Sequence, residues 1–403
     1  MTPAAPVLGK LRLGFVAQGA LAGTALAVYA LVLIQAGFQH QDLDAYLAAG
    51  RDLLSGHPLY AGFLQHPFPD PTLRPAYIYP PIFAILVSPL ALVPQPVAGA
   101  LWLLLNQLAL AASLLIVIRW LRPSPLAIAM VIAATLTFYP LWVDAVQGQA
   151  NLPLLFLVTL GVAGVIRGES RFALAIGAAA ALKLTPAVLL IWLVLDRRLK
   201  AAAWMLAGFG GLTLIGAVVR FRDTFVFFAQ VVPSLAPGTA VYANQSLVGF
   251  LGRIITANPY TTPWLVIPWT NLLVVLLAMG LIGIWFWRAR ERTALIRLAA
   301  FLPLAPLLSS VSWPHHLVIL LPVIWLSIIA IATREWPVVP TVVLAGLLLL
   351  FDVASRLSVG PPFNDPGFRL AQTTDPIVFV AANILFFATL TLFFAGPWLL
   401  RSR

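Results

Sequence analysis

Long apolar runs, separated by short polar stretches, make up most of this 403-residue chain. A helix that crosses a membrane needs about 20 apolar residues, because each residue rises about 1.5 Å across roughly 30 Å of hydrocarbon. The runs therefore predict spanning helices at about 13–36, 97–121, 125–140, 152–166, 201–219, 264–287, 295–309, 316–333, 337–354 and 376–399. The first run is longer than the apolar core of a signal peptide, so we expect it to be retained as a span.

Basic residues predict the direction of these helices, because Lys and Arg concentrate in cytoplasmic loops. Lys10 and Arg12 precede the first span, so the N-terminus is expected in the cytoplasm. Arg119 helps to close the run 80–121 on the cytoplasmic side, and the run can then cross only once. Residues 81–93 are therefore expected to form a helix at the outer interface. The segments expected outside the cytoplasm are 38–79, the polar turn 144–151, 220–263 and 355–375.

One further run, 172–195, does not fit this rule as a single helix. Basic clusters stand on both sides of it, and both are expected in the cytoplasm. Lys183 and Pro186 lie near its middle, so we expect two half-spans that meet there within the membrane. Irregular backbone at that depth is tolerated only where protein or a water-filled cavity covers it.

With both halves counted, the sequence predicts an all-α polytopic membrane protein of about twelve transmembrane segments, with both termini inside. We expect a single membrane domain over 1–403. Its first extracytoplasmic loop and interfacial helices are expected at about 37–96.

The composition excludes several classes of protein. Hydrophobic residues make up 61% of the chain and charged residues 9%, whereas an ordinary soluble domain carries roughly 25% charged residues. A cytosolic enzyme, a nucleic-acid-binding module and a disordered protein are therefore excluded. The net charge of +11 is explained by basic residues that orient the chain in the membrane, so no nucleic-acid partner is expected. The absence of cysteine excludes disulfides and thiol chemistry.

The predicted topology brings most of the unusual polar residues to the outer side. Ionisable residues in or beside apolar spans are costly, so each is a functional candidate by default. Structural alternatives stay open, because an acid could cap a helix expected at 42–55 and Lys183 could extend to the interface. Adjacent residues point about 100° apart on a helix, so His315 and His316 are not expected to share a metal ion.

An acid, a Lys and a pair of His residues on the outer side together suit a reaction between a hydroxyl and a phosphorylated sugar. A carboxylate can take the proton of a hydroxyl nucleophile. Lys and His can stabilise the negative charge that develops on a leaving phosphate. Aromatic and amide side chains would hold a sugar, and a lipid-exposed groove would admit a long prenyl chain.

Six short motifs occur in order over about residues 42–317. They are Asp42-Leu-Asp-Ala-Tyr46 with Leu54-Ser-Gly56-His-Pro-Leu-Tyr60, Tyr79-Pro80-Pro81 with Ser88-Pro89-Leu90, Gln147-Gly148-Gln149-Ala-Asn151, Leu182-Lys183-Leu-Thr-Pro186, Asn244-Gln245-Ser246-Leu-Val-Gly249 with Arg253, and Ser312-Trp313-Pro-His315-His316-Leu. The series resembles the motifs of glycosyltransferase family 87. Each motif is weak alone, whereas six in this order are specific. One departure is Pro314, which stands where the family usually has a polar residue before the two His.

The resemblance implies the GT-C fold, in which many membrane helices carry an active site on the extracytoplasmic side. It also implies inverting transfer of a hexose, usually mannose, from a polyprenyl phosphate to a lipid- or glycan-linked acceptor. Asp42 is then the general base. Lys183 and His316 are expected to bind the leaving phosphate, with His315 and Arg253 nearby. Contacts to the sugar or acceptor are expected from Asp44, Tyr46, Tyr79, Gln149, Asn151, Asn244 and Gln245.

The alternative class is a polytopic transporter or flippase of lipid-linked sugars without catalysis. Transporters usually have two matching halves with paired broken helices. The broken run 172–195 has no counterpart in the sequence, and the long first outer loop carries the leading acids. A non-catalytic scaffold would not need an acid, a Lys and two His on one side. We therefore expect a glycosyltransferase of a bacterial inner membrane, surrounded by lipid. No cofactor, metal or nucleotide-sugar site is expected, because no Gly-rich phosphate loop is present.

Overall fold

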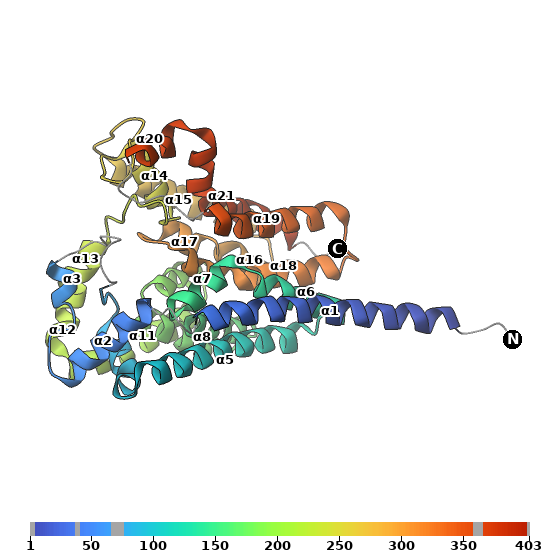
Figure 1. The fold of residues 1–403 in the computed structure, drawn as a ribbon, viewed down its shortest axis with the longest axis horizontal. Helices are drawn as coiled ribbons and strands as arrows, with labels where there is room; N and C mark the ends of the chain where they lie inside the picture. The colour runs from blue at the N-terminus through green and yellow to red at the C-terminus, as the bar shows by residue number, and fades with distance from the viewer. Residues whose placement is uncertain (1–4, 37–40, 66–75, 358–365, 401–403) are drawn as a thin grey trace.

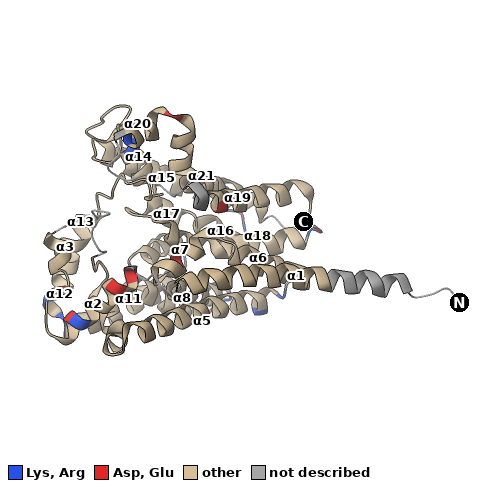
Figure 2. Cartoon of the chain, in the orientation of Figure 1, with Lys and Arg blue, Asp and Glu red and all other residues tan. Residues whose placement is uncertain are grey.

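The chain folds into a bundle of α-helices with short 3₁₀ and π segments (Figure 1). The computed structural model describes residues 5–36, 41–65, 76–357 and 366–400. Helix α1 begins and α21 ends toward the same end of the bundle, on the right of Figure 1, and α2, α3 and α12 lie at the other end. Figure 2 shows charged residues near both ends and around α14 and α20, with a single acidic residue on α7.

Among the described residues, six helical segments are long and apolar enough to cross a membrane. They are α1 (Ala5–Ala36), α5 (Gln95–Leu121), α11 (Leu199–Val219), α15 (Thr270–Ala289), η5 with α18 (Pro314–Leu320 and Leu321–Ala332), and α21 (Pro376–Leu399). A bent pair, α6 (Pro125–Leu136) and α7 (Tyr139–Gln147), makes a seventh if it is counted as one span. The chain is therefore an all-helical, multi-pass membrane protein, as the sequence predicts.

Shorter apolar helices occupy the remaining predicted spans, at 151–166, 170–182, 185–195, 294–308 and 338–353. The helices concerned are α8 (Asn151–Ile166), α9 (Ala173–Leu182), α10 (Leu189–Leu195), α16 (Ala294–Phe301), α17 (Leu304–Leu308) and α19 (Val338–Leu357). Because several of them are shorter than the roughly 20 residues that a full crossing needs, the count of twelve stays a prediction.

The break predicted in the run 172–195 is present. Helix α9 ends at Leu182, and Lys183 has extended backbone dihedrals of −152° and 125°. A 3₁₀ segment, η3 (Thr185–Val188), then leads into α10. Pro186 lies in η3 and has no N–H for a helical hydrogen bond, which explains why the helix does not continue.

Helix α9 packs closely on α11 through small residues. A Cβ atom on Gly177 would lie 2.0 Å from the Met205 carbonyl oxygen, and one on Gly208 would lie 2.5 Å from the Leu174 carbonyl oxygen. Glycine at these positions permits an approach that larger side chains would prevent. This contact packs the first half of the broken segment directly against a neighbouring helix.

The bend between α6 and α7 is 51° and differs from the single predicted span at 125–140. Pro140 lies in the first turn of α7, and Phe138 before it has extended dihedrals of −71° and 110°. The chain therefore leaves one helical axis and begins another. The polar stretch 144–151, expected as an outer turn, instead starts inside α7.

The first outer loop and its neighbours form short helices at the end opposite the termini. The helix expected at 42–55 is α2 (Gln41–Leu54), and the interfacial helix expected at 81–93 is α4 (Pro81–Val87) followed by η1 (Ser88–Leu92). The other short elements are α3 (Ala61–Gln65), η2 (Ser170–Phe172), α12 (Phe221–Val226), η4 (Phe227–Val231), α13 (Val232–Leu235), α14 (Leu247–Ile255) and α20 (Pro366–Thr374). The parts 37–40, 66–75 and 358–365 of the predicted outer segments lie outside the described residues.

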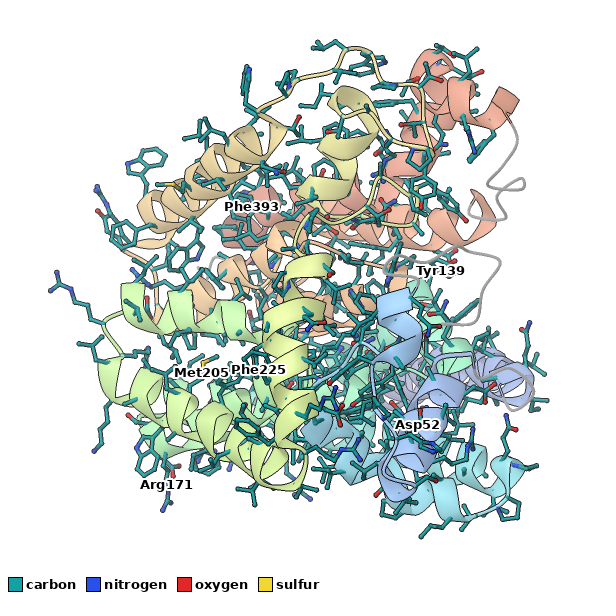
Figure 3. All side chains as sticks on the ribbon, turned by 90° about the vertical axis from the view of Figure 1, so that its left-hand side faces the viewer. Asp52, Tyr139, Arg171, Met205, Phe225 and Phe393 are labelled. Atoms are coloured by element: carbon teal, nitrogen blue, oxygen red, sulfur yellow. The ribbon has the colours of Figure 1, made fainter. Side chains whose placement is uncertain are left out.

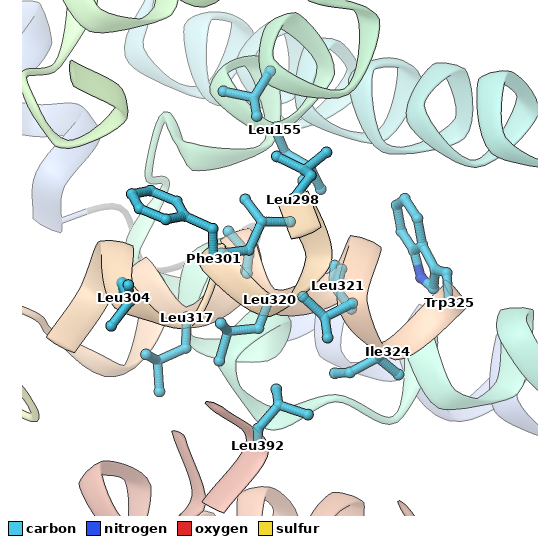
Figure 4. Close-up of a cluster of buried hydrophobic side chains, with 14 of the residues drawn as sticks. Leu155, Leu298, Phe301, Leu304, Leu317, Leu320, Leu321, Ile324, Trp325 and Leu392 are labelled. Atoms are coloured by element: carbon cyan, nitrogen blue, oxygen red, sulfur yellow. The ribbon is translucent and has the colours of Figure 1, made fainter. Parts of the chain in front are cut away.

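A dense apolar core lies beside the segment that carries the two histidines. Figure 4 shows Leu317 and Leu320 of η5 beside Phe301 of α16, with Leu155 of α8 and Leu392 of α21 on either side. All five side chains are fully or almost fully buried. Side chains fill the space between the ribbons when the bundle is viewed from the α2 and α12 end (Figure 3). This packing fixes η5, and with it the backbone of the histidine pair.

Candidate active site

The turn between α7 and α8 brings three polar side chains together. Helix α7 ends at Gly148, whose φ of 66° is left-handed and is least costly for glycine. The backbone N–H of Gln149 donates to the backbone carbonyl of Asp144 at 3.0 Å, and α8 then begins at Asn151. Asp144, Gln149 and Asn151 are all buried. One tight turn therefore presents a carboxylate and two amides to the interior.

Helix α2 connects Asp42 to this turn. Asp42 Oδ2 accepts a hydrogen bond from Gln149 Nε2 at 2.7 Å. Tyr46, one helical turn after Asp42, has its hydroxyl 2.8 Å from that of Tyr79. Both hydroxyls lie within hydrogen-bonding distance of Gln149 Oε1, at 3.0 and 3.1 Å. The first outer loop and the α7–α8 turn thus form one polar network.

Lys183 lies at the centre of this network. Its Nζ donates to Asn151 Oδ1 at 2.8 Å and lies 3.5 Å from Gln149 Oε1. It also lies 5.2 Å from the centre of the Tyr79 ring, which suits a cation–π contact. Asn151 Nδ2 in turn donates to Asp144 Oδ1 at 2.8 Å. An ammonium can only donate and a carboxylate can only accept, so these partners fix the orientation of both amides.

The histidine pair lies next to Lys183 and Asn151. Asn151 Nδ2 lies 3.3 Å from the His315 carbonyl oxygen, and the two imidazole rings meet edge to face with centroids 4.6 Å apart. The Trp313 amide donates to His316 Nδ1 at 3.3 Å, so the neutral His316 ring carries its hydrogen on Nε2. Neither ring nitrogen of the buried His315 has a hydrogen-bond partner within the described ranges. The His315 ring therefore keeps polar capacity for a ligand.

A small cavity of about 30 Å³ opens between Lys183, Asn151 and His316. Thr185 also lines it, and its remaining walls are apolar, from Leu154, Pro186, Val188, Leu189, Leu302, Ala305, Val318 and Ile319. The volume holds about two water molecules, so a phosphorylated sugar can enter only if the site widens.

Burial changes the acid–base behaviour of the groups on α2. It raises the pKa of Asp42 from 3.8 to about 6, against the opposing effects of the Gln149 hydrogen bond and the Lys183 charge. Burial also raises the pKa of Tyr46 well above its usual value, so Tyr46 stays a neutral hydroxyl. A carboxyl with a pKa near the working pH is suited to general base catalysis.

Asp44 does not join the network. Its Oδ1 accepts a hydrogen bond from Gln95 Nε2 at 2.6 Å at an exposed position. Residues two apart on a helix point about 200° from one another, so Asp42 and Asp44 face different surroundings. Asp44 therefore lies apart from the Asp42 network, and its expected contact with sugar or acceptor stays a prediction.

Arg253 is bonded outside the Lys183 network, and its expected place near the donor phosphate stays a prediction. It is 1% exposed, and its guanidinium donates to Asn383 Oδ1 at 2.8 and 2.9 Å and to the carbonyls of Val241 and Asn244, both at 2.9 Å. A guanidinium has five N–H groups, so these four contacts use most of them. It does not line the Lys183 cavity. Arg253 instead ties α14 to α21.

Asn244 and Gln245 brace the backbone that leads to the histidines. Asn244 Oδ1 accepts a hydrogen bond from the backbone N–H of Ser312 at 2.8 Å. The backbone N–H of Gln245 donates to the backbone carbonyl of Ser312 at 2.7 Å. The Gln245 side chain bonds to the backbone of α21, donating to Ala382 and accepting from Phe386, both at 2.9 Å. The side-chain amides of Asn244 and Gln245 are therefore bonded to backbone groups and brace this segment, and their expected contacts to sugar or acceptor stay a prediction.

Asp144 is the site residue that the sequence interpretation missed. It lies in α7, is 1% exposed and bonds to Asn151. It is the one acidic residue of the sequence between Asp70 and Glu169. An isolated acid in so long an apolar stretch is a signal that could have identified it.

Known proteins resemble this chain over most of its length. Residues 77–310 match the model of "Glycosyltransferase family 87". A polyprenol-phosphate-mannose-dependent alpha-(1-2)-phosphatidylinositol mannoside mannosyltransferase of Mycobacterium tuberculosis is 32% identical over 326 residues, which is 75% of this chain and 74% of the relative. The protein described in the same words from Mycolicibacterium smegmatis is 28% identical over 76% of this chain and 74% of its own length.

Among solved structures, ArnT from Cupriavidus metallidurans bound to undecaprenyl phosphate matches 94% of this chain and 78% of its own. Its TM-score is 0.44 and its sequence identity is 16%.

The fold and the sequence relatives define a membrane-embedded glycosyltransferase. The chain belongs to glycosyltransferase family 87. This confirms the resemblance seen in the sequence motifs and the prediction of an enzyme rather than a transporter.

Proposed function

We propose that the enzyme transfers mannose from a polyprenyl phosphate to a hydroxyl of a phosphatidylinositol mannoside-type glycolipid. The donor and the acceptor follow the names of the mycobacterial relatives. The GT-C architecture, with about twelve transmembrane segments in one domain over 1–403, belongs to this proposal, as does a site on the extracytoplasmic side of a bacterial inner membrane.

The proposed reaction is a single displacement with inversion. Asp42 takes the proton of the acceptor hydroxyl, and that oxygen attacks the anomeric carbon of the donor from the face opposite the phosphate. The bond between the anomeric carbon and the phosphate oxygen breaks, and polyprenyl phosphate leaves with the electron pair. Lys183 and Nε2–H of His316 stabilise the negative charge on the leaving phosphate. Tyr46 and Tyr79 hold Gln149, which orients Asp42.

The single observation that carries this proposal is the placement of Asp42 and Lys183 on opposite sides of Gln149. A base for the acceptor and a cation for the leaving group then lie within one network without neutralising each other in a direct ion pair. The apolar walls of the cavity beyond Lys183 suit the prenyl chain of the donor. A transporter has no need for a base poised beside a phosphate-binding cation.

The direct test of function uses purified protein in detergent with a phosphatidylinositol mannoside acceptor. Radiolabelled mannose should appear in a larger glycolipid when polyprenyl phosphate mannose is the donor, and not when GDP-mannose is. Product formation from GDP-mannose without a polyprenyl carrier would contradict the proposal. So would movement of donor across a liposome membrane without any glycolipid product.

The side of the membrane can be tested by cysteine labelling, because the natural chain has no cysteine to interfere. Ser55 follows α2, and Leu199 begins α11 beside the basic residues at 197–200; both positions are exposed. Impermeant maleimide should label Ser55→Cys in intact cells and should label Leu199→Cys only after the membrane is opened. The opposite pattern would place the site in the cytoplasm.

The raised pKa of Asp42 predicts how activity depends on pH. Only the deprotonated carboxylate can accept the hydroxyl proton, so kcat/KM should fall as the pH falls through about 6. Activity at pH 5 should be about tenfold below the plateau, because roughly a tenth of the carboxyl is then ionised. Initial rates from pH 4.5 to 8, at saturating donor and at acceptor concentrations well below KM, measure this limb. A flat profile down to pH 4.5 would exclude Asp42 as the base with this pKa.

A further inference from the structure

Asp144 is a buried carboxylate that the reaction described above does not use. Its Oδ1 accepts from Asn151 Nδ2 at 2.8 Å, and its Oδ2 has no hydrogen-bond partner in the part of the chain that the structure describes. A carboxylate that is 1% exposed is costly unless a positive charge lies near it. Along its hydrogen bonds, the next charged group is Lys183, one amide away.

Asp42 and Asp144 stand in the same relation to Lys183. Gln149 donates to Asp42 and turns its oxygen toward the ammonium, whereas Asn151 donates to Asp144 and turns its oxygen toward the ammonium. Each amide therefore separates one carboxylate from Lys183. None of the ion pairs found in the described ranges includes Lys183.

The placement of one carboxylate on each side of Lys183 has an electrostatic consequence. An ammonium that is attracted by one carboxylate alone moves toward it and pairs with it directly. Such a pair would make Asp42 a poorer base, because a nearby opposite charge favours the ionised form of an acid. It would also occupy N–H groups of Lys183 that the donor phosphate needs. A second carboxylate across the ammonium opposes this movement.

We propose that Asp144 is a positioning residue for the transfer reaction: it shares the Lys183 ammonium with Asp42 through the Asn151 amide, and so keeps Lys183 free for phosphate and Asp42 free for the proton. The roles of Asp42 and Lys183 in this statement rest on the function proposed above. The role of Asp144 is additional to it and has its own test.

Asp144→Asn removes the charge and preserves the shape. The new side chain keeps an oxygen that can accept from Asn151 Nδ2. Its amino group takes the place of Oδ2 in a cavity of about 10 Å³ that Asn106 also lines, and Asn106 Oδ1 has no partner among the described residues. The variant therefore gains a possible hydrogen bond, and we expect it to fold with an unchanged melting temperature.

The readout is the pH at which the Asp42 carboxyl takes its proton. Infrared spectra of the purified protein in detergent, recorded over pH 4 to 8, show the protonated carboxyl band, and its loss in Asp42→Asn assigns that band to Asp42. The charged and titratable groups around Asp42 are Lys183, Asp144, Tyr46 and Tyr79. Asp144→Asn removes one titratable carboxyl from this set and leaves Asp42 as the one acid beside Lys183 in the network. The midpoint should therefore fall from about 6 by roughly one pH unit.

Asp223→Asn is the matched control, because it removes a second buried carboxylate at the same end of the bundle. Asp223 bonds to Arg220 at 2.6 Å and to the Leu59 amide at 3.3 Å, and it has no bond to the Lys183 network. Its substitution should leave the Asp42 midpoint unchanged. An unshifted midpoint in Asp144→Asn, or an equal shift in both variants, would overturn the proposal and leave Asp144 a structural acid of the core.

Turnover separates this inference from the proposed function. Asp144→Asn should lower kcat at pH 7 by about tenfold and should move the acid limb of kcat/KM to lower pH, since Asp42 becomes a weaker base. If wild-type protein forms no product from polyprenyl phosphate mannose while the infrared midpoint still shifts, the proposed function fails, and the electrostatic coupling of Asp144 to Asp42 through Lys183 stands. Normal transfer with an unshifted midpoint would support the proposed function and overturn the role of Asp144.

Discussion

Asp42→Asn should lower kcat by roughly 10²–10⁴-fold, the range typical for loss of a general base. Asparagine has nearly the same size as aspartate, and its oxygen can still accept the hydrogen bond from Gln149 Nε2. It cannot take a proton from the acceptor at neutral pH. Folding and donor binding should persist, so the loss should appear in kcat and much less in KM. Steady-state transfer rates measure kcat and KM, and a melting curve of the same preparation measures folding.

Asp44→Asn is the matched control, because it makes the same change two residues away on the same helix. Asp44 bonds to Gln95 at an exposed position and lies outside the network. The variant should keep activity within a few-fold of wild type. If Asp42 served only to favour the start of α2, asparagine would replace it with little loss, since Asn and Asp are equally good at helix N-termini. A folded and active Asp42→Asn enzyme beside an inactive Asp44→Asn enzyme would contradict the role of Asp42 and indicate Asp44 as the base.

Lys183→Ala should lower kcat/KM for the donor by roughly 10²–10³-fold, because one preorganised cation at the leaving group is lost. The same change also removes a charge-assisted bond to the bound phosphate, so binding of polyprenyl phosphate should weaken. Transfer rates and equilibrium binding of labelled polyprenyl phosphate in detergent measure the two effects separately.

Lys183→Arg tests whether charge alone is sufficient. A guanidinium is larger and planar, and it cannot place one compact group of donors between the oxygens of Gln149 and Asn151 as an ammonium does. Recovery should therefore be partial. Full activity of the folded Lys183→Ala enzyme would reduce Lys183 to a residue that only extends toward the interface.

The main features of the broken segment could be predicted from the sequence. Basic clusters on both sides of 172–195 rule out a single crossing, and Lys183 with Pro186 marks the place of the break. The structure has its irregular backbone at that place, with α9 ending at Leu182. The position of α2 was also predictable, since its polar and apolar residues alternate with a helical period.

The sequence did not reveal which polar residues of the motifs face the site and which support it. Arg253 and Asn383 are separated by 130 residues, and their hydrogen bonds form only when α14 packs beside α21. An Arg within such a motif suggests a phosphate ligand when its partner is unknown. Asp144 was missed for the converse reason, because the bend before Pro140 turns an apparent outer loop into a helix that enters the core.

The most direct test of the site is a structure of the protein with polyprenyl phosphate bound. A phosphate oxygen should lie about 2.7–2.9 Å from Lys183 Nζ, with His316 beside it and the prenyl chain along the apolar walls of the same cavity. Asp42 should stay bonded to Gln149 on the far side of the network. A phosphate bound elsewhere, with Lys183 still bonded to Asn151 and Gln149 alone, would contradict the account.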